Sequence, residues 1–224
     1  MLLVDTGYPQ VATAVNAALE QRAPGKPVRF IVNTHEHYDH SGGDGLIGRQ
    51  PTVIAHVAAR DAALKPSAFA PGVSLPALEA RHAPSLTFEG SVTIPFNGED
   101  VRIIGLPAHA SGDSIVLFTS SHVLHMGDNF FPDAATYMYP GRNADAFFQT
   151  LGPLLRDLRA DTIVVSGHDA PVPLARLREI YATTESAFRF VQELKQQGKT
   201  IDEARKAGQE NGIPARWVQI FYGR

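Results

Sequence analysis

Continuous apolar runs and one amphipathic segment alternate at the start of the chain. Leu2–Val4 and Val28–Val32 are short apolar runs closed by turn residues, a pattern that predicts strands. Between them, apolar residues recur at the spacing of one helix face, namely Val11, Ala14, Val15, Ala18 and Leu19. The predicted strands show little polar alternation, so we expect a sheet that is covered on both faces.

The rest of the chain continues this mixture of strands and helices. Further strands are predicted at Pro51–His56, Ser91–Pro95, Val101–Leu106, Ser114–Thr119, His122–Met126 and Thr162–Ser166. Helices are predicted to start near Ser41, over 144–159 and in a long segment beyond Pro173. A shorter segment, Ile201–Glu210, and an aromatic end, Trp217–Tyr222, close the chain. Residues 66–84 are rich in Pro and Ala without periodicity, which predicts a long surface loop. The order indicates an α/β protein with helices outside its sheets.

Composition narrows the classes of function. The 224 residues fit one domain, which we place at 1–173, with a helical segment over 174–224 packed on it. Lys and Arg number 20 against 23 Asp and Glu, and no basic run occurs, which argues against nucleic-acid binding. No apolar run is long enough for a membrane span. Cysteine is absent, which excludes thiolate ligands and thiol catalysis.

A dense cluster of metal-ligand residue types follows the second predicted strand. The segment is His35-Glu36-His37-Tyr38-Asp39-His40. In an extended segment, residues two apart project to the same side, so His35 and His37 can bind one ion together. Asp39 and His40 point elsewhere as the chain turns into a helix, and could serve a second ion. Gly42 and Gly43 allow the backbone to pack closely behind this site.

Three more candidates lie at the ends of other predicted strands. His109 follows Val101–Leu106, Asp128 follows His122–Met126 and His168 follows Thr162–Ser166. Enzymes of the α/β class commonly build their sites from residues at strand ends.

Four segments together resemble those of the metallo-β-lactamase-fold hydrolases: HEHYDHSGG, PAHASGDS, HMGDN and SGHD. The resemblance runs from Val4 to His168 and implies a four-layer αββα sandwich. It also implies that His35, His37 and His109 hold a first metal, that Asp39, His40 and His168 hold a second, and that Asp128 bridges the two. Asp5 takes the position of the family's buried aspartate, which braces the metal loop without being a ligand.

The donor set suits a particular chemistry. Five imidazoles and two carboxylates without a thiolate favour Zn²⁺, with two ions per chain expected, and permit Fe or Mn. Such a pair generates a bridging hydroxide near neutral pH, which we expect to attack a small ester, lactone, thioester or related substrate. Asp39 would orient this nucleophile and take up its proton. Tyr38, Tyr137 and Tyr139 are candidates for contacts with the small-molecule substrate.

Several alternatives stay open. The C-terminal region resembles a SoxH-like or quinoprotein-relay-like branch of the family and lacks the long C-terminal domain of typical glyoxalase II enzymes. Persulfide dioxygenases resemble the same pattern but bind one iron through positions that match His35, His109 and Asp128. Weak β-lactamase-like activity and a non-enzymatic metal-dependent binding protein are further alternatives.

The start of the chain carries its own expectations. In the family, one or more strands usually precede the segment equivalent to Leu2–Gly7, so the first sheet is expected to lack an edge strand. Exposed sheet edges favour pairing with another chain, which predicts a homodimer through that edge. The first ten residues do not form a signal peptide. The compartment is therefore cytoplasmic if the start is genuine, and periplasmic or secreted if an upstream signal was removed.

Overall fold

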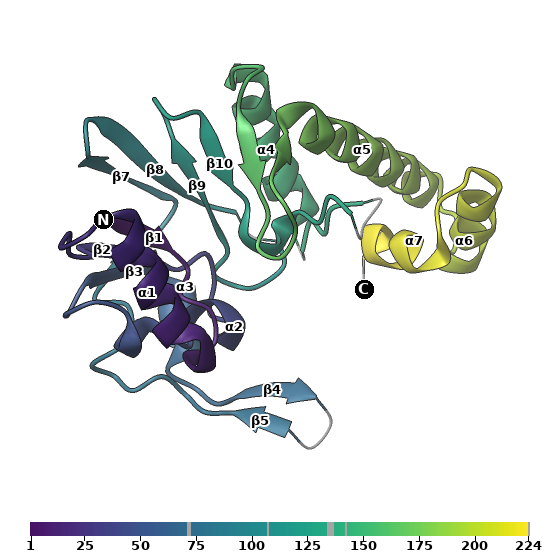
Figure 1. Ribbon diagram of the computed structural model, residues 1–224. Helices are drawn as coiled ribbons and strands as arrows, with labels where there is room; N and C mark the ends of the chain where they lie inside the picture. Colours follow the sequence, from purple (N-terminus) through teal and green to yellow (C-terminus); the bar gives the residue numbers. More distant parts are fainter. Residues whose placement is uncertain (71–72, 107, 134–136, 142, 224) are drawn as a thin grey trace.

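Two sheets form the centre of the computed structural model, which describes residues 1–70, 73–106, 108–133, 137–141 and 143–223 (Figure 1). The first sheet has four strands in the order β1-β2-β3-β6, and its neighbours all pair in parallel. These strands are β1 (Leu2–Val4), β2 (Phe30–Val32), β3 (Thr52–His56) and β6 (Leu86–Phe88). Because the strands are parallel, the loops that follow them gather at one edge of the sheet.

The second sheet has six strands in the order β12-β11-β10-β9-β8-β7. They are β7 (Ser91–Phe96), β8 (Glu99–Gly105), β9 (Ser114–Phe118), β10 (Val123–His125), β11 (Ile163–Val165) and β12 (Val172–Pro173). Strands β8 and β10 are both antiparallel to β9, and β11 is parallel to β10. The carboxyl ends of β8, β10 and β11 therefore lie on the same side of the sheet.

Three apolar clusters hold the layers together. Val32 and Ile54 of the first sheet pack against Ile103 and Val116 of the second. The outer face of the first sheet packs against α1, and the outer face of the second packs against α4 and the first half of α5. The order of layers is helix, sheet, sheet, helix, which confirms the αββα sandwich (Figure 1).

The α-helices are α1 (Ala12–Arg22), α2 (Tyr38–Ser41), α3 (Val57–Ala63), α4 (Ala144–Asp157), α5 (Leu174–Gln196), α6 (Ile201–Glu210) and α7 (Ala215–Tyr222). Short 3₁₀ turns occupy Pro9–Val11, Asp44–Leu46 and Gly127–Asn129. The predicted apolar face of α4 is buried at Phe147, Phe148, Leu151 and Leu155. For α1 the predicted stripe is rotated: Ala12 is buried, Val15 and Leu19 are partly buried and pack beside it, and Val11 is 43% exposed.

Some predicted elements were wrong or missing. The stretch 66–84 was predicted to be a loop, but it contains a hairpin of β4 (Ser67–Ala70) and β5 (Val73–Leu75), whose strands are too short to show a period. Strands β6 and β12 and helix α3 were not predicted. The helix expected to start near Ser41 instead begins at Tyr38 and ends at Ser41, so Asp39 lies in its first turn.

The C-terminal helices form a cluster of their own beyond the sandwich. Val191 on the second half of α5 packs with Ala204 of α6 and with Trp217 and Val218 of α7. Figure 1 shows α5 extending away from the sheets, with α6 and α7 at its far end. Among the residues that the structure describes, none of the helices combines the length and apolar character needed to cross a bilayer.

Candidate metal centre

Three imidazoles meet where the first sheet faces the second. His35 lies in the loop between β2 and α2 and is fully buried, whereas His37 in the same loop is exposed. His109 reaches them from the loop after β8. The ring centroids of these three histidines are 4.6 Å (His35–His37), 4.9 Å (His35–His109) and 4.7 Å (His37–His109) apart. The spacing of two residues therefore places His35 and His37 side by side, as the sequence predicts.

A second group lies next to the first. Nε2 of His40 is 3.3 Å from Nε2 of His168, which comes from the loop after β11. Asp39 Oδ2 is 3.6 Å from Nε2 of His40 and 3.4 Å from Nε2 of His168. Two histidines and one carboxylate from different sheets thus converge on one point.

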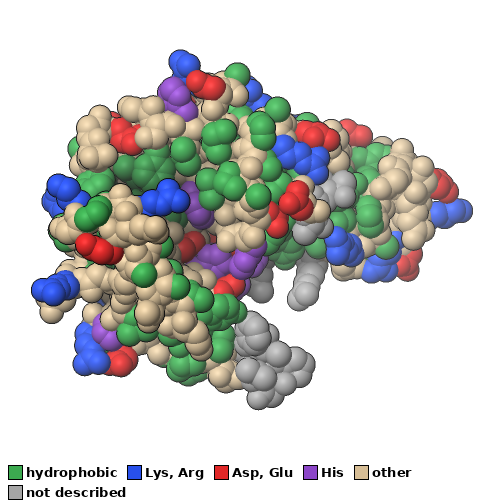
Figure 2. Space-filling view, viewed as in Figure 1, with side chains coloured by type: hydrophobic (Ala, Val, Ile, Leu, Met, Phe, Trp, Pro, Cys, Tyr) green, Lys and Arg blue, Asp and Glu red, His purple; other side chains and the backbone are tan. Residues whose placement is uncertain are grey.

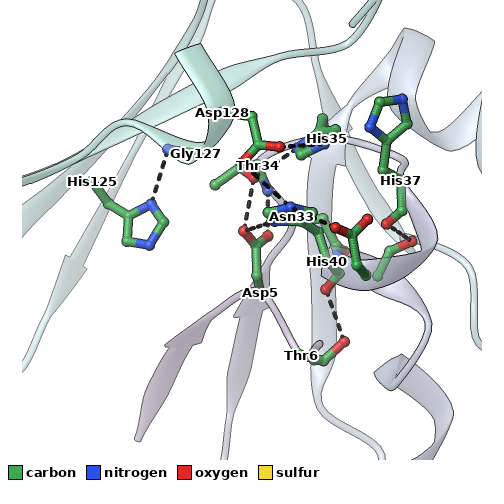
Figure 3. Close-up of polar contacts among 12 residues, drawn as sticks. Asp5, Thr6, Asn33, Thr34, His35, His37, His40, His125, Gly127 and Asp128 are labelled. Atoms are coloured by element: carbon green, nitrogen blue, oxygen red, sulfur yellow. Dashed lines mark hydrogen bonds and ion pairs between the residues drawn. The ribbon is translucent and has the colours of Figure 1, made fainter. Parts of the chain in front are cut away.

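Asp128 lies between the two groups. Its Oδ2 is 3.8 Å from Nε2 of His35 and 3.2 Å from Nε2 of His168, and its Oδ1 is 3.3 Å from Nε2 of His40. Figure 3 shows its carboxylate approaching the histidines from the loop after β10. One carboxylate therefore faces both groups, with a separate oxygen available to each.

These residues fit a metal by their chemistry and by their unmet hydrogen bonding. The possible ligand atoms form two groups, and within each group they lie within 4.8 Å of one another. The first group is His35, His37, His109 and Asp128, and the second is Asp39, His40 and His168. Buried Nε2 of His35 and Nδ1 of His109 have no hydrogen-bond partner. Such groups are costly to bury unless something binds them. All seven residues predicted as ligands are brought together; their role as ligands stays a prediction.

Asp5 holds two histidines of this cluster in place through hydrogen bonds. Its residue adopts a left-handed backbone (φ 56°) after β1. Oδ1 accepts a hydrogen bond from the Thr34 backbone N–H (2.7 Å), and Oδ2 accepts one from the Thr34 hydroxyl (2.8 Å). Oδ2 also lies 2.9 Å from Nδ1 of His40, and the Thr34 hydroxyl lies 3.0 Å from Nδ1 of His35 (Figure 3). Asp5 thus fixes the Nδ1 atoms of two histidines, directly or through Thr34, so that their Nε2 atoms face Asp128.

The sequence did not identify the residues that hold His109. Asp113, four residues later, is buried and places Oδ1 3.7 Å from Nδ1 of His109. The Asn129 side chain accepts a hydrogen bond from the His109 backbone N–H (3.3 Å). The four motifs contain Asp113 and Asn129, and Thr34 directly precedes the first of them. Their position next to the predicted ligands is the feature of the sequence that indicates a supporting role.

Burial and neighbouring charges shift the pKa values of several residues in the cluster. Burial lowers the pKa of His35 to about 3, so this imidazole is neutral. Burial also disfavours the charged form of His40, but its hydrogen bonds with Asp128 and Asp5 outweigh this and raise its pKa to about 10. The same bonds outweigh burial at Asp128 and hold the pKa of its carboxyl well below the usual range. Without an ion, a positively charged His40 therefore lies between the carboxylates of Asp5 and Asp128 and offsets part of their charge.

Close backbone packing is needed behind Asp128. A side chain at Gly167 would begin 2.0 Å from Oδ1 of Asp128 and would displace the carboxylate. Gly43 is similarly restricted, since a Cβ there would lie 2.9 Å from the backbone oxygen of Thr6. Only glycine permits these approaches, as expected for Gly43 from the sequence.

Two pockets flank the cluster, and they separate the three predicted substrate-contacting tyrosines. Tyr38 lines a pocket of about 410 Å³ together with Glu36, His37 and Ser111. Tyr139 lines a pocket of about 500 Å³ beside His109. Tyr137 is not brought to the cluster, because its buried ring packs against Trp217 (5.2 Å between ring centroids). Figure 2 shows histidine and acidic side chains gathered in a recess at the middle of this face.

Comparisons with known proteins agree with this geometry. The family model of the metallo-β-lactamase superfamily matches residues 2–168. The hydroxyacylglutathione hydrolase of Rhodospirillum rubrum is 28% identical over 165 residues, which cover 74% of this chain and 57% of the relative. The chain thus spans a little over half the length of this curated relative.

Solved structures show the same fold. A sec-alkylsulfatase from Pseudomonas sp. superposes with a TM-score of 0.67 at 20% identity, over 99% of this chain and 43% of the other. The BLEG-1 B3 metallo-β-lactamase superposes with a TM-score of 0.60 at 21% identity, over 78% of this chain and 84% of the other. The chain belongs to the metallo-β-lactamase superfamily.

Proposed function

We propose that the protein is a dinuclear zinc hydrolase of a small ester, lactone, thioester or related substrate. The position of Asp128 between the two groups of ligand atoms is the observation that carries this proposal. A site for one ion would need only one of the two groups, whereas here each group has at least three donors. Asp128 supplies the shared carboxylate.

Each residue has a role in this proposal. His35, His37 and His109 would hold one ion, Asp39, His40 and His168 would hold the other, and Asp128 would supply a carboxylate oxygen to each. Divalent ions held there would supply activation of water and polarisation of the substrate's electrophilic bond. Asp39 would orient the nucleophile and accept its proton.

The flanking pockets would receive the two sides of the substrate. The pocket beside His37 has a mixed lining that includes Glu36, Tyr38 and Lys65, and the pocket beside His109 includes Tyr139 and Asn143. Ser111 lines both, so they adjoin at the cluster. A substrate whose scissile bond lies at the ligand atoms can therefore place one of its groups in each pocket. Tyr38 and Tyr139 are the aromatic residues placed to contact it.

Thioesters come first among the substrates to test, because the curated relative from Rhodospirillum rubrum is a hydroxyacylglutathione hydrolase. This chain covers 57% of that relative, so recognition of the glutathione part is a proposal of its own.

The test combines metal analysis with a substrate panel. Protein purified without chelator should contain about two zinc ions per chain by elemental analysis and should hydrolyse at least one of the thioesters, esters and lactones. The panel includes β-lactams and phosphodiesters. About one iron per chain, with activity independent of His40, would refute the dinuclear proposal and support the persulfide dioxygenase alternative.

A further inference from the structure

A buried carboxyl group outside the ligand set lies directly behind the metal loop. Asp44 begins the turn Asp44–Leu46, four residues after His40, and is only 3% exposed. Its Oδ1 accepts hydrogen bonds from the Thr6 hydroxyl (2.9 Å) and from the Asn33 side-chain amide (3.1 Å). None of the ion pairs among the described residues includes Asp44, and an ionised carboxylate buried without a cation is costly.

Asp44 and Asn33 each have one oxygen without a hydrogen-bond partner. Oδ2 of Asp44 and Oδ1 of Asn33 are both buried, and neither has a hydrogen-bond partner. They belong to two side chains already joined by one hydrogen bond, from Asn33 Nδ2 to Asp44 Oδ1. If Asp44 is ionised, two acceptor oxygens are left without a donor. A proton on Asp44 Oδ2 supplies that donor and closes the paired arrangement of a carboxylic acid with a primary amide.

We propose that Asp44 is a neutral carboxylic acid in the folded protein and that it positions the metal loop through Asn33 and Thr6. Asn33 follows β2 and stands two residues before His35. The Thr6 hydroxyl lies 3.0 Å from the backbone oxygen of His40, and the Thr6 backbone N–H donates to the same oxygen (2.7 Å). Asp44 thus connects both ends of the segment from His35 to His40. Figure 3 shows Thr6, Asn33 and His40 around this segment.

The surroundings favour the neutral form. Burial raises the pKa of Asp44 to about 7, against the lowering effect of its hydrogen bonds, and the nearby Asp5 carboxylate raises it further. On the other side, Asp44 shares a pocket of about 310 Å³ with Arg81 and His82. Arg81 pairs instead with Glu79, at 2.8 Å.

The pH dependence follows from this arrangement. A carboxyl in the unfolded chain loses its proton near pH 4, whereas folded Asp44 keeps its proton to about pH 7. Between these values the folded state binds more protons, so the stability contributed by Asp44 falls as pH rises and is lost above about pH 7.

The test compares Asp44→Asn with the wild type, both free of metal. An asparagine places an N–H donor where the proposal places the O–H, without a titrating group. The ratio of the wild-type unfolding constant to that of Asp44→Asn should rise by up to about tenfold per pH unit between about pH 5 and 7. Infrared spectra at pH 6 should show a protonated-carboxyl band that Asp44→Asn removes. The exposed Asp100→Asn is the control and should change neither.

Two outcomes overturn the proposal: a stability ratio that does not vary with pH, or a carboxyl band that persists in Asp44→Asn. Asp44→Ala should be destabilised throughout this range, and rescue by Asn but not Ala supports the pairing with Asn33. The protonation of Asp44 is measured without metal, so this test is independent of the proposed dinuclear site. The positioning role rests on the proposed function, and its readout is the zinc affinity of Asp44→Asn and Asp44→Ala at pH 6.

Discussion

His35 and Asp128 come from different sheets, yet Nε2 of His35 lies 3.8 Å from Oδ2 of Asp128. The loops after β2 and β10 therefore meet at the seam of the sandwich, and the cluster is built by both sheets. Bound ions would join the two halves of the fold.

Removing the metal should lower stability as well as activity. Exhaustive dialysis against a chelator should lower the melting temperature, because an ion that binds only the folded state adds about 4 kcal/mol at a free concentration a thousand times its dissociation constant. Differential scanning calorimetry with and without added zinc measures the shift. An unchanged melting temperature after verified metal loss would contradict binding across the seam.

Replacing His40 should separate a dinuclear site from a mononuclear one. His40→Ala should reduce bound zinc from about two ions to about one per chain and reduce kcat by about a hundredfold or more, since one ligand group is lost. Elemental analysis and steady-state kinetics measure both. The control is His122→Asn, because His122 has a left-handed backbone (φ 52°) that asparagine tolerates. Full activity in His40→Ala would refute the role of the second group.

Zinc affinity should increase with pH. His40 holds a proton up to about pH 10 in the absence of metal, and that proton must leave before Nε2 can bind an ion. His35 is already neutral and releases none. Calorimetry in buffers of different ionisation enthalpy should show release of about one or more protons per chain at pH 7. Affinity independent of pH between 6 and 8 would contradict the assignment of His40 as a ligand.

Asp5 should act through the ligands that it orients. Asp5→Asn removes the charge that faces His40 and should weaken zinc binding by about 10- to 100-fold, as is typical when a group that orients a ligand is changed. Competition with a chromophoric chelator gives the affinity. Asp157→Asn, at an exposed position of α4, should leave it unchanged. An equal loss in both variants would point to a general effect of charge.

The first sheet ends in an exposed edge at β1, which pairs only with β2 among the described strands. From this edge we predict a homodimer in which two copies of β1 pair. Light scattering during size-exclusion chromatography should give twice the chain mass. Because the chain has no cysteine, Leu3→Cys should form an intermolecular disulfide, whereas Ser91→Cys on the edge strand β7 should not. A stable monomer at micromolar concentration would contradict the prediction.

The sequence predicts most of the sandwich because its strands are continuous apolar runs and α4 carries a strong 3.6-residue period. It does not predict β6 or β12, whose three and two residues are too short for any pattern. The seven clustered residues were identified because the motifs place ligand residue types at strand ends. Thr34, Asp113 and Asp44 act through neighbours that only the folded chain brings close, and Tyr137 was misplaced because nothing local indicates its packing against α7.

Tyr137 also connects the last helix to the pocket beside His109. Its ring packs on Trp217 and Phe221 of α7, and the next residue, Met138, donates its backbone N–H to the Thr184 hydroxyl of α5 (2.9 Å). Tyr139 follows at once and lines the pocket beside His109. Substitutions in the last helix would therefore shift the wall of the proposed substrate pocket while all seven clustered residues stay unchanged.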